Sequence, residues 1–157
     1  MKQPLIQLHM SVFLAGFTGI LGVLIQLNEL PLVWYRMGIT FLTLLFILFF
    51  KKQSLQLSLH NIFILIGIGM LIALHWVLFY ASIKFANVSV GLVCFAATSL
   101  FTAILEPIFN KTAWKKAELA LGLFSLFGIY IIFQFDIKFR TGILFGIASA
   151  MIAALFS

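Results

Sequence analysis

The side chains that could do chemistry gather in one stretch of the chain, residues 75–107. The stretch reads HWVLFYASIKFANVSVGLVCFAATSLFTAILEP and joins two strongly apolar segments through a short polar turn at residues 84–87. Polar groups inside apolar segments are costly, so each needs a partner, a water-filled cavity or a ligand. We therefore look for function among the polar residues embedded here, which are His75, Tyr80, Cys94, Thr98, Ser99, Thr102 and Glu106.

His75 lies near the middle of an apolar segment, so its imidazole cannot easily reach either end of that segment. One interpretation is a neutral imidazole bonded to another helix. The other is a group that responds to protons or contacts a ligand. The neighbouring Trp76 and Tyr80 are typical of packing or interfacial aromatic residues.

A polar stripe follows on the next segment. Gly91, Thr98, Thr102 and Glu106 are spaced by seven, four and four residues, which places them on one side of a helix. Such a stripe lines either a tight helix interface or a wet cavity. Glu106 either pairs with Lys111 or a neighbouring helix, or acts as a carboxylate that couples protons or substrate.

Arg36 lies about one turn inside the start of another apolar segment. At that depth its side chain can anchor the helix by extending to the interface, or it can contact an anionic substrate group. Both interpretations stay open from the sequence.

No stretch has the spacing of a catalytic or metal-binding motif. The chain lacks a Gly-rich phosphate loop, an HExxH sequence, a Cys/His ligand cluster and a nucleophile elbow. We expect a protein that is not an enzyme and that uses no cofactor and no metal ion.

The composition excludes a soluble domain. Of 157 residues, 64% are hydrophobic and 9% are charged, whereas soluble chains carry about 25% charged residues. The net charge of +6 sits in short loops between apolar runs, so it indicates membrane orientation and not nucleic-acid binding. The single cysteine, Cys94, excludes an intrachain disulfide and is expected to pack as a small hydrophobic residue.

The hydrophobic pattern predicts an all-α membrane protein, a polytopic transmembrane helix bundle. About 20 apolar residues are needed for a helix to cross the hydrocarbon. Six apolar segments approach this length, and their short connections make sequential neighbours antiparallel. They are residues 8–27, 32–50, 62–83, 88–109, 117–134 and 141–157.

Small residues recur along one face of two of these helices. The first has Ser11, Ala15, Gly19, Gly22 and Gln26, and the last has Gly142, Gly146, Ala150 and Ala153. Because small residues let helix backbones approach closely, both faces are predicted to pack against neighbouring helices.

The basic residues predict the orientation in the membrane. One side holds Lys2, Lys51, Lys52, Lys111, Lys115 and Lys116, and the other holds Arg36, Lys84, Lys138 and Arg140. The side richer in Lys and Arg is expected to be cytoplasmic. We therefore expect a cytoplasmic N-terminus and a location in a bacterial inner membrane.

The sixth segment stops at Ser157 without a polar flank, which indicates a fragment of a longer chain. Five helices and the start of a sixth mark where a second half would begin, and an odd number of spans makes that half enter inverted. We therefore divide the chain into a first repeat, residues 1–137, and the start of a second, residues 138–157.

Three stretches resemble the EamA-like transporters of the drug/metabolite transporter superfamily. They are LVWYRMGITFLTLL with its early Arg36, FYASIKFANVSVGL, in which Tyr80, Ala81, Ser89 and Gly91 match, and FTAILEPIF with its late Pro107. The chain departs from the family pattern in having Ser99 where a proline is common, about eight residues before Pro107, and Lys111 and Thr112 where an acid is frequent.

The resemblance implies a ten-helix inverted repeat with both termini cytoplasmic and a central cavity between the halves. It also implies transport of small metabolites or drugs, often as export. On this hypothesis the residues that line or gate the cavity are Arg36, His75, Tyr80, Thr98, Thr102 and Glu106, with Glu106 as the candidate for proton linkage.

Two other functions stay open. The chain could be a short transporter that works as an antiparallel homodimer, although it has more than four apolar segments and no acid in the first helix before Glu29. It could also be a non-transporting membrane scaffold subunit whose polar stripes pack against a partner. In each case we expect the lipid bilayer as an environment, and the partner to be either the missing C-terminal half or a second copy.

Overall fold

The computed structural model describes residues 2–52, 57–133 and 137–157, and every regular element in these ranges is helical. The elements are α1 (Lys2–Leu24), α2 (Glu29–Phe50), α3 (Leu59–Phe85), α4 (Val88–Ala96), α5 (Thr98–Asn110), α6 (Lys116–Phe133), the short 3₁₀ helix η1 (Ile137–Phe139) and α7 (Arg140–Phe156). The predicted all-α fold and its six segments are confirmed, with α4 and α5 forming one segment.

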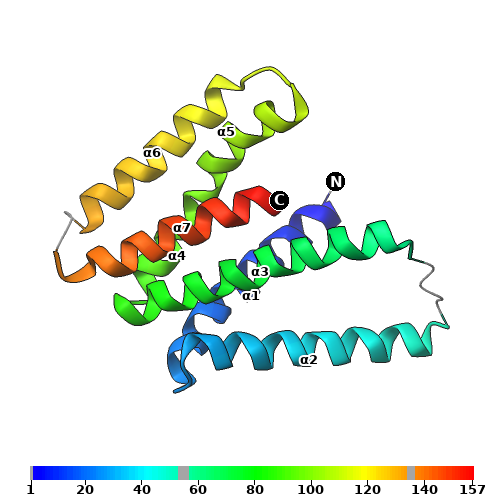
Figure 1. The fold of residues 1–157 in the computed structure, drawn as a ribbon. Coiled ribbons are helices and arrows are strands. Elements are labelled where there is room, and N and C mark those ends of the chain that lie inside the picture. The colour runs from blue at the N-terminus through cyan, green and yellow to red at the C-terminus, as the bar shows by residue number, and fades with distance from the viewer. Residues whose placement is uncertain (1, 53–56, 134–136) are drawn as a thin grey trace.

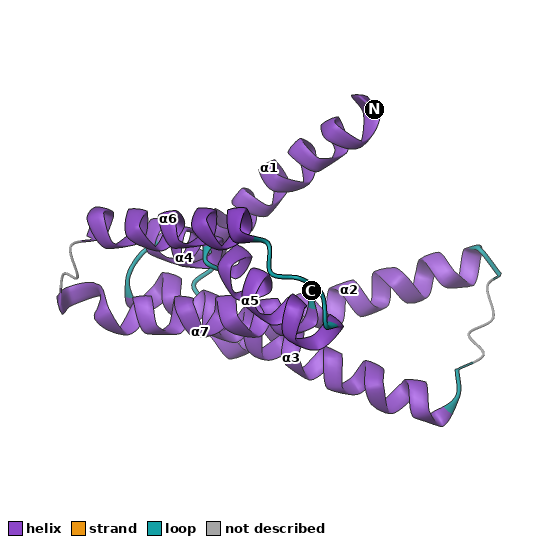
Figure 2. Cartoon of the chain, turned by 90° about the horizontal axis from the view of Figure 1, so that it is seen from above, coloured by secondary structure: helices purple, strands orange, loops and turns teal. Residues whose placement is uncertain are grey.

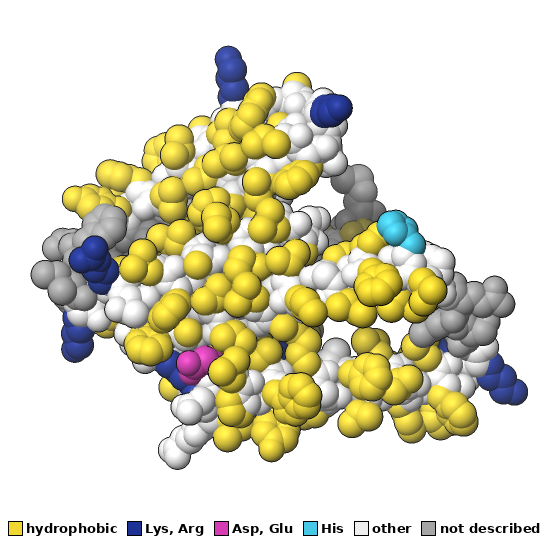
Figure 3. Space-filling model, in the orientation of Figure 1, with side chains coloured by type: hydrophobic (Ala, Val, Ile, Leu, Met, Phe, Trp, Pro, Cys, Tyr) yellow, Lys and Arg dark blue, Asp and Glu magenta, His cyan; other side chains and the backbone are white. Residues whose placement is uncertain are grey.

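Four of the described helical stretches are long and apolar enough to cross a membrane by length and composition. They are residues Gln3–Leu24, Glu29–Phe50, Leu59–Phe85 and Val88–Asn110, and α7 is a shorter apolar helix. Figure 3 shows hydrophobic side chains over most of the visible face, with Lys and Arg at its edges. This surface is that of a protein surrounded by lipid.

Helix boundaries differ from the prediction mainly at prolines and caps. The first helix begins at Lys2 and not near residue 8, and Pro4 is tolerated in its first turn because backbone N–H groups there have no acceptor within the helix. The second begins at Glu29, with Pro31 in its first turn for the same reason. The predicted end of the fifth helix, residue 134, lies outside the described residues.

The turn between α3 and α4 contains only Ala86 and Asn87. The Oδ1 atom of Asn87 accepts a hydrogen bond of 2.9 Å from the backbone N–H of Val90, which caps the start of α4. This short turn makes α3 and α4 antiparallel neighbours, as the sequence predicted.

The predicted helix 88–109 is broken at Ala97. The hydroxyl of Thr98 donates to the carbonyl of Phe95 at 2.6 Å, and that of Ser99 donates to the carbonyl of Ala96 at 2.9 Å. These carbonyls would otherwise accept from the helix backbone, and the N–H of Leu100 instead reaches the Ala97 carbonyl at 3.0 Å. Hydroxyl groups that bond back in this way bend helices.

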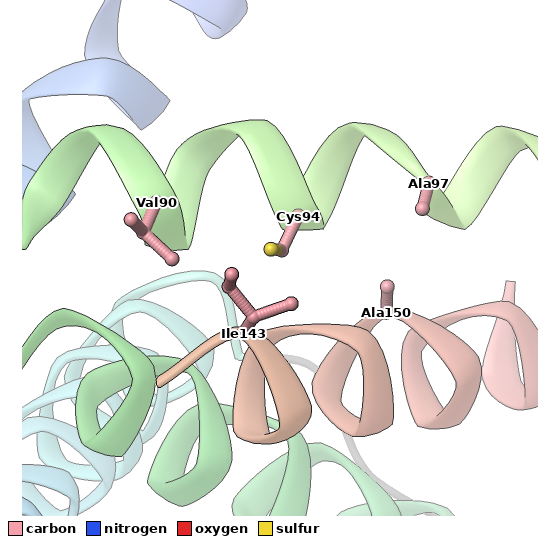
Figure 4. Close-up of a cluster of buried hydrophobic side chains, with 5 residues drawn as sticks. All are labelled: Val90, Cys94, Ala97, Ile143 and Ala150. Atoms are coloured by element: carbon pink, nitrogen blue, oxygen red, sulfur yellow. The ribbon is translucent and has the colours of Figure 1, made fainter. Parts of the chain in front are cut away.

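The core lies where α7 meets α3 and α4 (Figure 1). Val90, Cys94 and Ala97 face Ile143 and Ala150 (Figure 4), and all five side chains are buried. Cys94 is a free, buried thiol and packs as the small hydrophobic residue that was expected.

α1 and α2 lie at the edge of this core. α1 crosses α3, and its N-terminal half projects away from the other helices (Figure 2). α2 contacts α3 through its first turns, where Leu32 and Val33 are buried. The space between α1, α2 and α3 is therefore bounded on one side by the core and open on the other.

Candidate functional site

Arg36 on α2 reaches across to two aromatic residues of α3. Its Nη1 atom donates a hydrogen bond of 2.7 Å to the hydroxyl of Tyr80. Its guanidinium carbon lies 3.5 Å from the centroid of the Trp76 ring, well inside the distance at which a cation is attracted to an aromatic face. The side chain therefore turns toward a neighbouring helix and is held there by a hydrogen bond and a ring.

The position of Tyr80 depends on Gly22 of α1. A Cβ atom at position 22 would lie 2.5 Å from Cε1 and 2.7 Å from Cδ1 of Tyr80. The Trp76 and Tyr80 rings stack with their centroids 5.7 Å apart. Residues from α1, α2 and α3 thus meet at one point, and the small residue on α1 makes the space.

Two cavities adjoin this point. The first, of about 360 Å³, lies between α1, α2 and α3 and is lined by Thr18, Leu21, Gly22, Ile25, Leu27, Leu32, Tyr35, Arg36, Ile39, Thr40 and Tyr80. The second, of about 310 Å³, lies between α1, α3 and α4 and is lined by Val12, Gly16, Thr18, His75, Trp76, Phe79, Leu92 and Phe95. Thr18 lines both, so the two cavities are neighbours along one groove.

His75 connects the second cavity to α7. Its Nδ1 atom lies 3.0 Å from the carbonyl oxygen and 2.9 Å from the hydroxyl oxygen of Ser149, and the Ser149 hydroxyl donates to the His75 carbonyl at 3.1 Å. Because a carbonyl oxygen can only accept, the hydrogen of the neutral imidazole belongs on Nδ1. The lone pair then remains on Nε2. The expectation of an imidazole bonded to another helix is confirmed, and the same ring also lines a cavity.

The remaining predicted residues lie elsewhere. Thr98, Thr102 and Glu106 line neither cavity. Thr98 bonds back to its own helix, and the Thr102 hydroxyl lies 3.3 Å from that of Ser157. The stripe thus faces α7 in part, which matches the interface interpretation for these two hydroxyls.

Glu106 is half-buried on α5, and the described part of the chain offers it no ion pair within 4 Å, so the considered pairing with Lys111 does not form. Lys115 instead pairs with Glu118, Nζ to Oε1, at 3.0 Å. The hydrogen bond and charge of Glu118, and more weakly the charge of Glu106, raise the pKa of Lys115. Glu106 therefore lies within electrostatic range of Lys115.

A third cavity, of about 400 Å³, lies at the end of α3. It is lined by Asn28, Glu29, Leu30, Pro31, Lys84 and Phe85. Glu29 and Lys84 carry opposite charges on the two sides of this cavity. Glu29 lies at the start of α2, seven residues before Arg36, and Lys84 lies at the end of α3.

Sequence reasoning missed three residues of the groove and the hydrogen-bond partner of His75. Trp76 was interpreted as a packing residue, and Gly22 only as part of a small-residue face, while Thr18 and Ser149 were not singled out. The spacing of four between Trp76 and Tyr80 was a usable signal, because it places both rings on one face of α3. Ser149 carried no signal, since its partner is 74 residues away.

The described residues contain no group of three or more His, Cys, Asp and Glu side chains that could hold a metal ion. Comparison with known proteins gives one positive finding: the model of the EamA-like transporter family matches residues 4–134. No curated protein and no solved structure matches the chain.

Proposed function

Since the chain belongs to the EamA-like transporter family, we propose that it is a secondary transporter that moves small metabolites or drugs across the membrane. The observation that carries this proposal is the groove of two adjoining cavities between α1, α2, α3 and α4. It combines apolar walls with a few polar groups that converge from three helices, which is the usual composition of a small-molecule site.

The groove needs a second wall. One side is closed by the core, and the other is open beside α1 and α2, so a further helical unit completes the pathway. The division into a first repeat, residues 1–137, and the start of a second, inverted repeat, residues 138–157, is part of this proposal. The family match supports it, because that match ends at residue 134, before α7. A second copy of the chain in antiparallel orientation is the alternative wall.

Transport by reconstituted vesicles tests the function. The full chain is placed in liposomes, and movement of labelled amino acids, aromatic carboxylates, nucleosides and ethidium is followed. We expect at least one of these solutes to move, and Tyr80→Ala to abolish that movement because it removes the partner of Arg36. Phe124→Ala is the matched control, since this aromatic side chain on α6 is 75% exposed. No movement above that of empty liposomes contradicts the proposal.

Glu106 is the proposed proton-coupling residue. It is half-buried, and no Lys or Arg side chain of the described residues pairs with its carboxyl group. We expect Glu106→Gln to remove the pH dependence of transport while leaving the protein folded. Glu118→Gln, which removes only the exposed pair with Lys115, is the control. An unchanged rate and pH profile in Glu106→Gln excludes this role.

A further inference from the structure

We propose that Arg36 is the anchor of a binding site for a carboxylate on an apolar or aromatic molecule, and this inference rests on the proposed transport function. It assigns a chemical class of substrate to the cavity of about 360 Å³ between α1, α2 and α3.

The first argument is the charge. The side chains that line this cavity with Arg36 are neutral, and among the described residues the ion pair within 4 Å is Lys115–Glu118, far along the chain. Glu29 lines the neighbouring cavity together with Lys84, whose charge opposes its own. A cation among apolar helices is costly unless an anion compensates it. The cavity beside Arg36 is where that anion can enter.

The second argument is the supply of donors. A guanidinium group has five N–H donors, and one of them bonds to Tyr80. In the described chain, the buried side-chain N or O atom that has no hydrogen-bond partner is Ser82 Oγ. No nitrogen of Arg36 is therefore both buried and unpaired. The other Arg36 nitrogens remain accessible at the cavity that Arg36 lines.

The third argument is preorganisation. The Trp76 ring lies against one face of the guanidinium group, and the Tyr80 hydroxyl holds Nη1, so the plane of the group is fixed by two contacts before any ligand arrives. A planar guanidinium group of fixed orientation matches the two oxygens of a carboxylate. The remaining walls are mainly aliphatic with the ring of Tyr35, which suits an apolar or aromatic body.

The fluorescence of Trp76 provides a direct test, because Arg36 lies on its ring. The chain has three tryptophans, and Trp34 and Trp114 are 78% and 50% exposed. Replacing both by Phe leaves Trp76 as the reporter. The full chain in neutral detergent is titrated with 3-phenylpropanoate and, separately, with the uncharged 3-phenylpropanamide.

We expect saturable binding of the carboxylate and at least about tenfold weaker binding of the amide, since a site built for a charged hydrogen-bonding group rejects its neutral analogue. Arg36→Gln should remove the preference, and Arg36→Lys, which keeps the charge but not the fork, should retain part of it. Arg140→Gln, at the exposed start of α7, is the matched control and should bind like the parent. Equal affinity for the two probes, or a preference that survives in a folded Arg36→Gln variant, overturns the proposal.

A lipid phosphate is the competing source of negative charge. The titration is therefore repeated in nanodiscs of phosphatidylcholine with and without phosphatidylglycerol. Binding of 3-phenylpropanoate in both supports a solute site, whereas a Trp76 signal that responds only to phosphatidylglycerol overturns it. Carboxylate binding without transport leaves the anion site intact and contradicts the transport function. Transport of neutral solutes without carboxylate preference contradicts the anion site alone.

Discussion

The contact between Arg36 and Tyr80 exists because position 22 has no side chain. The Tyr80 ring occupies the place of a Cβ atom on α1 and is 4% exposed. The hydroxyl at the end of this ring accepts from Arg36. The absence of a side chain at Gly22 on α1 therefore allows the contact between Arg36 on α2 and Tyr80 on α3.

We expect Gly22→Ala to push the Tyr80 ring away and break its bond to Arg36. Overpacking of this kind costs about 1–3 kcal/mol. The free energy of unfolding in detergent should fall, and so should the affinity for 3-phenylpropanoate in the Trp76 titration. Gly38→Ala on α2 is the control, because nothing lies within 4 Å of its added Cβ and it lines neither cavity. Equal effects of the two substitutions would contradict this account.

At this scale the sequence predicted which residue types matter but not which of them meet. Arg36, His75 and Tyr80 all border the groove, and their polarity inside apolar segments was the signal. Thr98, Thr102 and Glu106 gave the same signal and lie elsewhere. Helical spacing assigns residues to one face of one helix, and it carries no information on which neighbour that face meets.

The packing face of α7 is made mainly of small residues. Its buried residues include Gly142, Gly146, Ser149, Ala150 and Ala153, which contains the small-residue face that the sequence predicted. A Cβ atom at Gly146 would lie 2.6 Å from that of Cys94. The face allows α7 to approach α3 and α4 closely enough for Ser149 to bond to His75.

Gly142→Val should separate α7 from α3. An added Cβ would overlap that of Ala86 and lie 2.9 Å from the carbonyl oxygen of Ser82, and backbone atoms cannot give way as a flexible side chain does. We expect a loss of about 1–3 kcal/mol in the free energy of unfolding. Gly67→Val on α3, where nothing lies within 4 Å, should cost no more than the propensity difference. Chemical unfolding of both variants in detergent decides between them.

Apolar length and periodicity were enough to predict the six segments, because each is set by local sequence. The break at Ala97 was not predicted. The polar stripe on this helix was interpreted by the face it occupies, whereas Thr98 and Ser99 use their hydroxyls on their own backbone. Side-chain rotamers decide between these two uses, and a sequence does not specify rotamers.

In the whole molecule, the predicted grouping of the Lys residues agrees with the directions in which the helices run. The end of α2 and the α5–α6 connection lie toward one end of the bundle, and the α3–α4 turn lies toward the other (Figure 1). Lys51, Lys52 and Lys111 belong to the first end, and Lys84 to the second. The antiparallel arrangement expected from the short connections is therefore present.

Cysteine labelling of intact cells checks the predicted orientation. Both variants carry Cys94→Ala, so that the buried native thiol does not react. We expect an impermeant maleimide to label Lys84→Cys from outside and to label Lys52→Cys only after permeabilisation, because the side richer in Lys and Arg stays in the cytoplasm. Both positions are exposed. The reverse pattern would contradict the orientation.

At the break at Ala97, two hydroxyl groups bond to backbone carbonyls of the same span. A proline removes a backbone N–H permanently. Here every N–H is still present, and net hydrogen bonds of this kind contribute only about 1 kcal/mol each. Rotation of the Thr98 and Ser99 side chains would return the Phe95 and Ala96 carbonyls to the backbone. The break at Ala97 therefore rests on two side-chain hydrogen bonds and not on a missing backbone donor.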